Sequence, residues 1–161
     1  MPTPTYTLID SVTLGSSASS VTFSGISATG KGDLVLAVTA SSASGGGFQV
    51  RINGDSGANY PYVQMFGNGS SAISNGSSSE TGLTGSYVRT YPVMQTYQIQ
   101  DFAATDKHKA ILSRNNAASN ETRAVASSWA STSAITSISA TISANTFDVG
   151  STFNLFQIVS E

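Results

Sequence analysis

Short runs in which apolar and polar residues alternate recur along the whole chain, and they constrain its fold more than any other feature of the sequence. In the run GFQVRIN at 47–53, Phe48, Val50 and Ile52 alternate with polar residues. Because successive side chains of a strand point to opposite faces, a period of two is typical of a half-buried strand. Similar runs, separated by stretches rich in Gly, Ser and Asn, lie at 5–14, 19–26, 32–41, 59–66, 90–102, 107–115, 122–131, 134–143 and 150–160. About nine or ten short strands with turns between them indicate an all-β sandwich or barrel.

The composition agrees with a β-rich fold and argues against several classes of partner. Charged residues make up 10% of the chain, against about 25% in typical soluble domains, and serine and threonine take their place. With 15 glycines and few Glu or Lys residues, helix propensity is low nearly everywhere. A net charge of −2 offers no electrostatic attraction for nucleic acid. No segment approaches the length of about 18 apolar residues that a membrane span requires, and the chain has no cysteine for disulfides.

A chain of 161 residues fits one domain. Pro2 and Pro4 favour an extended backbone, so residues 1–6 are expected to form an arm and residues 7–161 a single β-sandwich domain. The first residues contain no basic region followed by an apolar run, so we expect no signal peptide. The stretch 67–86 has few apolar residues and is expected to be a long loop. The expected core positions are Phe23, Leu34, Leu36, Val38, Phe48, Val50, Ile52, Ile138 and Phe153.

The tetrapeptide Gly54-Asp55-Ser56-Gly57 has the sequence that surrounds the nucleophile of chymotrypsin-like serine proteases. A serine nucleophile needs a histidine that accepts its proton and a carboxylate that orients the histidine. The single histidine, His108, lies between two lysines and follows Ser56 in the chain, whereas the histidine precedes the serine in that class. We therefore interpret the tetrapeptide as a turn, in which both glycines adopt positive φ and Asp55 and Ser56 bond nearby backbone amides.

Metal-binding and acid–base chemistry have weaker signals in the sequence. Asn53, Asp55 and Asn59 lie at alternate positions, as ligands do in a calcium loop. Gly57, between them, offers only its backbone, and no glutamate closes the loop at the required spacing. One histidine and no cysteine do not supply the ligands of a zinc site. The aspartates lie mostly at expected strand ends, where nothing selects the carboxylate pair of a glycosidase, so we expect no catalytic, cofactor-binding or metal-binding residue.

Aromatic residues provide most of the candidates for contact with a partner. Trp129, the only tryptophan, is expected in the core. Tyr60 and Tyr62 flank the glycine turn and the stretch 67–86, so they either contact sugars or protein partners or cap the rim of the core. The full set of candidate partner-contact residues is Pro2, Pro4, Tyr60, Tyr62, Tyr87 and Tyr91.

Several segments resemble, in this order, a β-sandwich domain of structural proteins from tailed bacteriophages. These segments are SSVTFSGI at 19–26, GDLVLAV at 32–38, RINGDSGANYPYVQMFGNGSS at 51–71, ITSIS at 135–139 and GSTFNLFQI at 150–158. The most specific pieces are RINGDSGANY and GSTFNLFQI, and residues 72–131 match least. Such domains occur in head decoration, cement or fibre proteins, and sometimes in tail components, and they carry no catalytic motif. The resemblance implies a virion-bound β-sandwich that is often trimeric.

The residues and the resemblance together predict a non-enzymatic virion structural protein with a jelly-roll-like antiparallel β-sandwich. We expect a homotrimer, made in the host cytoplasm, that binds the major capsid protein on the outer capsid surface and acts as a decoration (cement) protein. It is expected to contact neither nucleic acid nor a membrane directly. The alternative is a tail-fibre or receptor-binding module, in which Tyr60, Tyr62 and residues 67–86 would hold a host-surface glycan.

Overall fold

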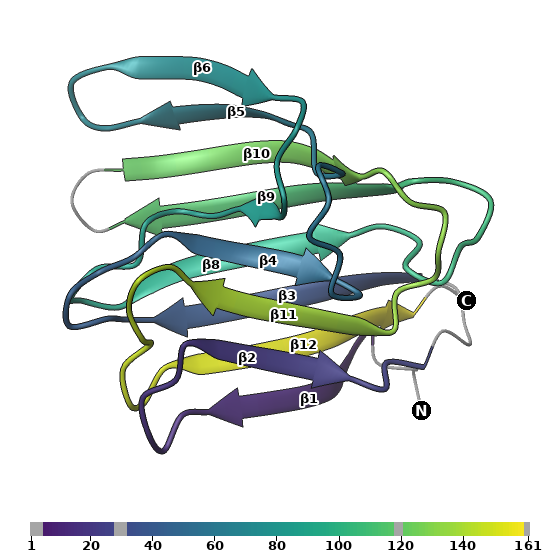
Figure 1. Ribbon diagram of the computed structural model, residues 1–161, viewed down its shortest axis with the longest axis horizontal. Coiled ribbons are helices and arrows are strands. Elements are labelled where there is room, and N and C mark those ends of the chain that lie inside the picture. Colours follow the sequence, from purple (N-terminus) through teal and green to yellow (C-terminus); the bar gives the residue numbers. More distant parts are fainter. Residues whose placement is uncertain (1–4, 28–31, 118–120, 160–161) are drawn as a thin grey trace.

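The computed structural model describes residues 5–27, 32–117 and 121–159, and the regular elements in these ranges are all strands. They form two antiparallel sheets that make a sandwich (Figure 1). The larger sheet has the order β1 (Tyr6–Thr13), β12 (Thr152–Val159), β3 (Gly32–Ala40), β8 (Val93–Ile99), β9 (Lys109–Ala117), β10 (Glu121–Trp129), β5 (Tyr62–Gly67) and β6 (Ala72–Ser77). The smaller sheet has the order β2 (Ser20–Ser24), β11 (Ser137–Ile142), β4 (Phe48–Ile52) and β7 (Leu83–Thr84). The all-β sandwich predicted from the alternating runs is therefore confirmed.

Eight of the strands form a jelly roll. The order β1-β12-β3-β8 in the larger sheet is matched by β2-β11-β4-β7 in the smaller one. The chain changes sheet at every step from β1 to β4, and again between β7 and β8 and between β11 and β12. Strands far apart in the sequence thereby become neighbours, such as β3 with β12 and β4 with β11. Two sheets of four strands connected in this way are the double Greek key of a jelly roll, as expected.

Two hairpins extend the larger sheet beyond the jelly roll. The β5–β6 hairpin is inserted between β4 and β7, and the β9–β10 hairpin between β8 and β11. Together they continue the larger sheet from β8 in the order β9-β10-β5-β6, which occupies the upper part of Figure 1. The smaller sheet has no corresponding strands. The described part of the chain therefore contains twelve strands rather than the nine or ten expected from the sequence.

The stretch 67–86 is not the continuous loop that its composition suggested. It contains β6, which pairs with β5 along its whole length, and the short strand β7, which pairs with β4. All but one of the β6 side chains are exposed, so this edge strand needs no apolar alternation. β6 is held by backbone hydrogen bonds to β5, and such bonds do not require alternating apolar and polar residues in its sequence.

All nine residues predicted for the core are buried between the sheets. Trp129 is also buried, as expected, and Tyr97 is a further buried aromatic residue. Phe147 fills the middle of the core, where its ring centroid lies 5.1 Å from that of Phe153 and 5.9 Å from that of Phe48. Phe147 lies in the connection before β12, where no alternating run predicts burial.

Polar side chains hold the segment before β8 against the inner side of the larger sheet. Arg123 on β10 forms a 2.8 Å ion pair with Glu121, and the Ser86 hydroxyl donates to the same carboxylate over 3.3 Å. The side-chain oxygen of Gln95 accepts hydrogen bonds from the Ser86 N–H (3.0 Å) and the Tyr97 hydroxyl (3.2 Å). Hydrogen bonds thus replace part of the apolar packing where the smaller sheet ends.

The expected N-terminal arm falls mostly outside the described residues, which begin at residue 5. The candidate contact residues Pro2 and Pro4 lie in the part that is not described. Tyr6 already belongs to β1, which pairs with β12, so the first strand begins one residue before the predicted boundary between residues 6 and 7.

Candidate functional site

Large apolar side chains gather on the outer face of the larger sheet, which points away from the smaller sheet. Six of them are between 53% and 66% exposed: Tyr6, Leu8, Val63, Met65, Met94 and Leu112. We call the hollow part of this face the trough; its side chains include Tyr6, Val35, Val63, Met65, Thr96, Leu112, Arg114, Ala124 and Ala126. Scattered exposed apolar residues are normal in soluble proteins, whereas apolar side chains that line one hollow make it a candidate interaction surface.

The pairing registers explain why these side chains share one face. Leu112 on β9 pairs with Ala126 on β10, and Ala126 pairs in turn with Val63 on β5. Ala124 and Met65 form the next such pair along the same strands. Because directly opposed residues of antiparallel strands point to the same side, alternate positions of the two inserted hairpins build the trough.

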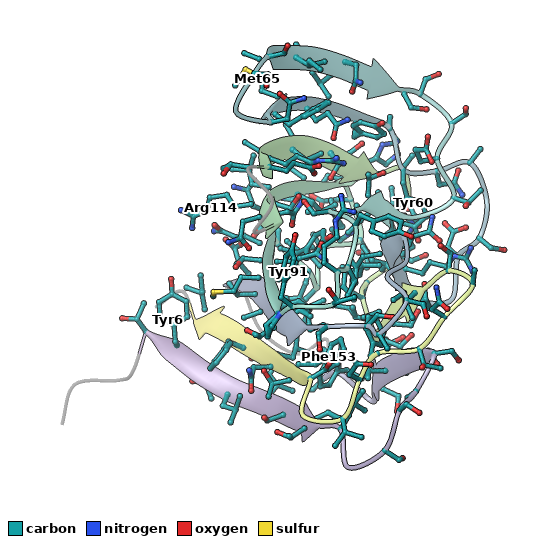
Figure 2. The ribbon with its side chains drawn as sticks, turned by 90° about the vertical axis from the view of Figure 1, so that its left-hand side faces the viewer. Tyr6, Tyr60, Met65, Tyr91, Arg114 and Phe153 are labelled. Atoms are coloured by element: carbon teal, nitrogen blue, oxygen red, sulfur yellow. The ribbon has the colours of Figure 1, made fainter. Side chains whose placement is uncertain are left out.

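The larger sheet curves toward its outer face. A single cavity of about 710 Å³ is lined by Tyr6 on β1 and by Val63 on β5, although five strands lie between β1 and β5. Figure 2 shows Tyr6, Arg114 and Met65 along the outer side of this sheet, with Phe153 on the side of the core. The trough is therefore concave, and its two rims lie on β1 and on the β5–β6 hairpin.

The trough carries little charge. Apart from the bulge in β1, the pairing registers of the described strands place two charged side chains on this face, Asp33 and Arg114. The Asp33 carboxylate accepts hydrogen bonds from Gln98 Nε2 (2.9 Å) and from the Asp101 N–H (3.1 Å). Arg114 is exposed, and its guanidinium has neither a hydrogen bond nor an ion pair with another described residue. The charge in the trough that has no partner among the described residues is therefore the positive charge of Arg114.

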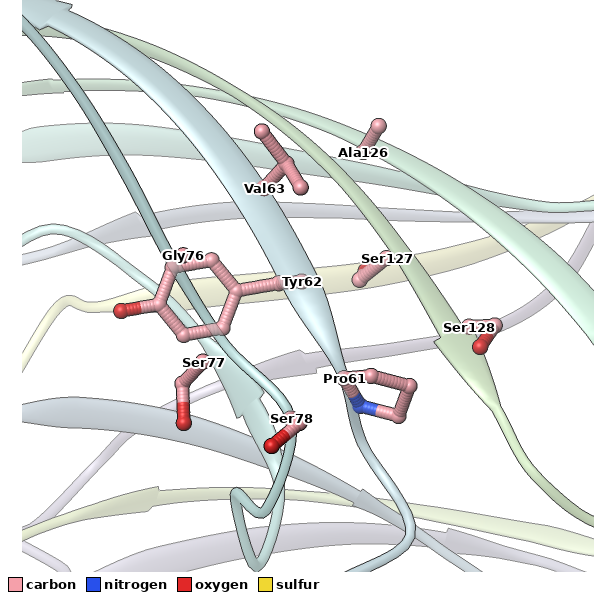
Figure 3. A pocket seen from close by; sticks show the side chains of 9 residues that line it. All are labelled: Pro61, Tyr62, Val63, Gly76, Ser77, Ser78, Ala126, Ser127 and Ser128. Carbon is pink, nitrogen blue, oxygen red and sulfur yellow. The ribbon is translucent and has the colours of Figure 1, made fainter.

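A second hollow, the β5–β6 recess, adjoins the trough where β5 begins and β6 and β10 end (Figure 3). Its volume is about 550 Å³, and it shares Val63 and Ala126 with the trough. Tyr62 lies in it beside the hydroxyls of Ser77 and Ser78. An aromatic ring next to hydroxyl groups combines an apolar surface with hydrogen-bonding capacity.

The turn from Gly54 to Gly57 holds Asp55 against the indole of Trp129. The Asp55 carboxylate accepts hydrogen bonds from Trp129 Nε1 (2.7 Å), the Gly57 N–H (2.8 Å) and Asn59 Nδ2 (3.0 Å). The hydrogen bond from Trp129 lowers the pKa of Asp55, while partial burial acts in the opposite direction. Gly54 has the expected positive φ, at 68°, whereas Gly57 does not, because the Asp55 side chain closes the turn there instead.

These contacts agree with a turn rather than a nucleophile at Ser56. The Ser56 side chain is exposed, and within the described ranges no hydrogen bond joins it to His108. Asp55, the adjacent carboxylate, is held by Trp129 and is not directed toward a histidine. Among the described residues, no histidine is therefore bonded to Ser56 as a general base would be.

The same turn does not have the shape of a calcium loop. The side-chain oxygen of Asn53 accepts hydrogen bonds from the N–H groups of Thr136 (2.8 Å) and Ser137 (3.0 Å), which join the turn to the start of β11. The Asp55 oxygens are directed to Trp129 and Asn59. In the part of the chain that the structure describes, no group of three or more His, Cys, Asp or Glu residues could hold a metal ion.

Lys109 is buried on the inner side of the larger sheet, next to Trp129. Its Nζ donates to the carbonyl oxygens of Ala104 (2.7 Å) and Lys107 (3.2 Å) and lies 6.0 Å from the centre of the Trp129 ring system. Burial lowers the pKa of Lys109. This ammonium group anchors the connection between β8 and β9.

The four candidate tyrosines lie in different environments. Tyr60 is fully buried, which contradicts the partner contact and agrees with the alternative that it belongs to the core. Its hydroxyl accepts a hydrogen bond from the Ile52 N–H (3.1 Å), and burial raises its pKa to about 12. Tyr62 lines the β5–β6 recess. Tyr87 is exposed, with the Arg89 guanidinium 4.8 Å from its ring centre. Tyr91 is half-buried and packs against the core.

Sequence reasoning missed the residues of the trough. Val63 and Met65 alternate with Gln64 in the run 59–66, but alternation alone does not say which face meets the core. Here Gln64 is buried and its apolar neighbours are exposed. In a chain with so few charges, an apolar–polar–apolar run does not show which face of the strand meets the core. Only the pairing of the two inserted hairpins determines that.

The described residues include no helix with the length and hydropathy needed to cross a bilayer. Comparison of the chain with protein-family models, curated proteins and solved structures finds no match.

Proposed function

We propose that this protein is a non-enzymatic virion structural protein that decorates and stabilises the outside of a capsid by protein–protein contacts. The proposal combines the resemblance of the sequence to phage decoration domains with the exposed trough. Its partner is the major capsid protein, it works without a cofactor as a homotrimer, and it is made in the host cytoplasm and mounted on the virion. Jelly rolls are a common architecture of viral capsid domains, which agrees with this role.

The exposed apolar trough is the observation that carries the proposal. Eight strands about 4.8 Å apart, each about 20 Å long or more, present a face of about 700 Å². This area is close to the roughly 800 Å² that each partner contributes to a standard-size protein interface. A face of that size with several exposed large apolar side chains and few charges suits permanent contact better than exposure to water.

Energetic considerations point in the same direction. Burying apolar surface stabilises a complex by about 25 cal/mol per Å², although ordering costs reduce the net gain considerably. Three linked copies bind with a higher effective concentration, so contacts of modest strength can hold for the life of a particle. With little charge in the trough, binding should depend weakly on salt.

The test is DNA release against temperature, at low and high salt, for particles that lack the protein and for the same particles after adding it back. The wild-type protein should raise the release temperature at both salt concentrations. The double variant Leu112→Ser with Met65→Ser should not, because it removes apolar surface from the trough. Thr22→Ala, an exposed change on the outer face of the smaller sheet, is the matched control and should act like the wild type. Identical release curves with and without the protein would refute the cement role.

The β5–β6 recess favours a second candidate function, a tail-fibre or receptor-binding module. Tyr62 offers a ring on which a sugar can stack, and the neighbouring serine hydroxyls can bond sugar hydroxyls. A glycan array distinguishes the two functions. Binding of a host-surface glycan that Tyr62→Ala abolishes would favour the receptor-binding module.

A further inference from the structure

We propose that the trough binds a single amphipathic α-helix of a partner protein, aligned with the strands, and that a carboxylate on the apolar face of this helix pairs with Arg114. The inference deepens the proposed function and rests on it, because it takes the trough as the docking face and adds the chemistry of the partner. Laying an apolar helix face into a groove is a recurrent mode of protein recognition.

The width of the concave trough admits a helix. From β1 to β5 the larger sheet spans seven strands, so the arc across the trough is about 29 Å long at about 4.8 Å per strand. A helix with its side chains is about 10–12 Å across, and its axis lies about 10 Å from a surface on which it packs. The trough is therefore wide enough to receive one side of a single helix.

A small amphipathic ligand fits the trough less well. Sites for small molecules bury about 70–90% of the ligand surface. The side chains along the trough, such as Leu112 and Met65, remain more than half exposed, and the cavity spreads across most of the sheet rather than closing over a tunnel. A long and wide occupant covers such a surface, whereas a single acyl chain leaves most of it in water.

A second copy of the chain does not supply a complementary surface. Two troughs facing each other are both concave, so neither can fill the other. The outer face of the smaller sheet carries Gln49, Arg51, Ser139 and Thr141, which are polar and offer no apolar surface to the trough. Neither of the two broad faces of this chain therefore complements the trough, and the occupant that we propose is convex and apolar.

Arg114 determines the charge of that occupant. It projects from β9, the fifth strand of eight, with Thr96 and Ala124 as its cross-strand neighbours. The other charged group of the face, Asp33, already has two hydrogen-bond donors, whereas Arg114 has no described partner. A guanidinium covered by an apolar partner needs an anionic acceptor, and a carboxylate is the side-chain group that matches its two-pronged geometry.

The experiment measures binding of two synthetic helical peptides to the full chain by calorimetry at low salt. Both peptides have 16 residues and a leucine face; one carries Glu and the other Lys in the middle of that face. The wild-type protein should bind the Glu peptide about tenfold more tightly than the Lys peptide. Arg114→Glu should reverse this preference. Arg51→Glu, a charge change of the same kind on the other sheet, should leave it unaltered, and thermal unfolding verifies that each variant is folded.

Two outcomes would overturn the inference: wild-type protein that binds neither peptide, or a preference for Glu that Arg114→Glu does not change. If one oleate molecule per protein chain displaced the bound peptide completely, the trough would be a site for a small amphipathic ligand. That result would also refute the helix proposal. The peptide assay uses no virion, so its result is separate from that of the DNA-release assay. A reversed peptide preference in a protein that leaves DNA release unchanged would retain the helix site and refute the cement role.

Discussion

The side chain of Asp55 stabilises the turn at Gly54–Gly57, a tetrapeptide whose sequence alone could be a turn or a nucleophile motif. Its carboxylate accepts three hydrogen bonds, and the shortest comes from Trp129, 74 residues later in the chain. This contact joins the turn after β4 to the end of β10. Hydrogen bonds to a charged acceptor are stronger than those between neutral groups, so Asp55 is expected to stabilise the join between the jelly roll and its extension.

Substitutions in the tetrapeptide should show that Asp55 contributes to stability and that Ser56 does not. We expect Asp55→Ala to lower the free energy of unfolding by about 1–3 kcal/mol, because Trp129 Nε1 loses its acceptor inside the protein. Ser56→Ala should change it by less than about 0.5 kcal/mol, because the Ser56 side chain is exposed. Urea unfolding measures both values. Labelling of Ser56 by a fluorophosphonate probe would contradict the turn interpretation.

The pH dependence of stability should also depend on Asp55. Its pKa is lower in the folded protein than the ordinary value of 3.8, so the unfolded chain binds the proton more readily. The stability that Asp55 contributes is therefore complete above the unfolded pKa and is lost as the pH falls through the lowered folded pKa. We expect the difference in urea midpoint between the wild type and Asp55→Asn to shrink between pH 5 and pH 2. If the difference in urea midpoint stayed constant over this range, the charged form of Asp55 would not be the source of the stabilisation.

At the level of single residues, the sequence predicted positions correctly where local backbone chemistry determines the conformation. It did not predict them where tertiary packing determines whether a side chain is buried. The turn at Gly54 and the buried core positions follow from backbone conformation and alternation. The glycine turn beside Tyr60 is consistent with a contact surface or with the rim of the core, and the structure shows its hydroxyl bonding the backbone of Ile52 inside the protein. A tyrosine at the rim of a core and one on a surface have the same sequence context, so the distinction needs the tertiary fold.

At the scale of elements, the eight jelly-roll strands and the two inserted hairpins differ in how readily the sequence reveals them. Burial alternates along both β3 and β4 because one face of each meets the core, but only the sequence of β4 alternates, since residues 34–38 of β3 are all apolar. β6 has no alternation, because it is an edge strand with water on both sides, and β7 has two residues. The topology that places the hairpins side by side depends on pairing between β10 and β5, which no local pattern encodes.

Gly85 provides a test of how closely the segment after β7 packs on the larger sheet. A Cβ atom at this position would overlap Gln95 Oε1 and would come within 2.5 Å of the Tyr97 hydroxyl. Gly85→Ala should therefore lower the free energy of unfolding by about 1–3 kcal/mol, since the buried network has no room to yield. Gly15→Ala is the control, because no atom lies within 4 Å of its Cβ position. Equal unfolding midpoints for the two variants would show that the segment does not pack as described.

At the scale of the whole molecule, the fold separates two surfaces of opposite character. The outer face of the smaller sheet is covered with Ser, Thr and a few longer polar side chains, whereas the outer face of the larger sheet is concave and carries most of the exposed large apolar side chains among its polar ones. The inserted hairpins create this asymmetry, because they widen the larger sheet without adding to the smaller one. The molecule thus has one face suited to water and one suited to a partner.

This separation predicts that the trough contributes to binding and little to folding. The double variant Leu112→Ser with Met65→Ser should change the free energy of unfolding by less than about 1 kcal/mol, because both side chains are more than half exposed. It should also reduce the fluorescence of a dye that binds exposed apolar surface. A loss of several kcal/mol, as for a core substitution, would mean that these side chains support the fold.

The most direct test of the proposed docking role is imaging of the purified virion at a resolution that places this chain. We expect copies on the outside of the capsid, grouped in threes, with the larger sheet turned toward the capsid protein and an apolar helix in the trough beside Arg114. Finding the chain on the tail, or on the capsid with the trough facing solvent, would contradict it.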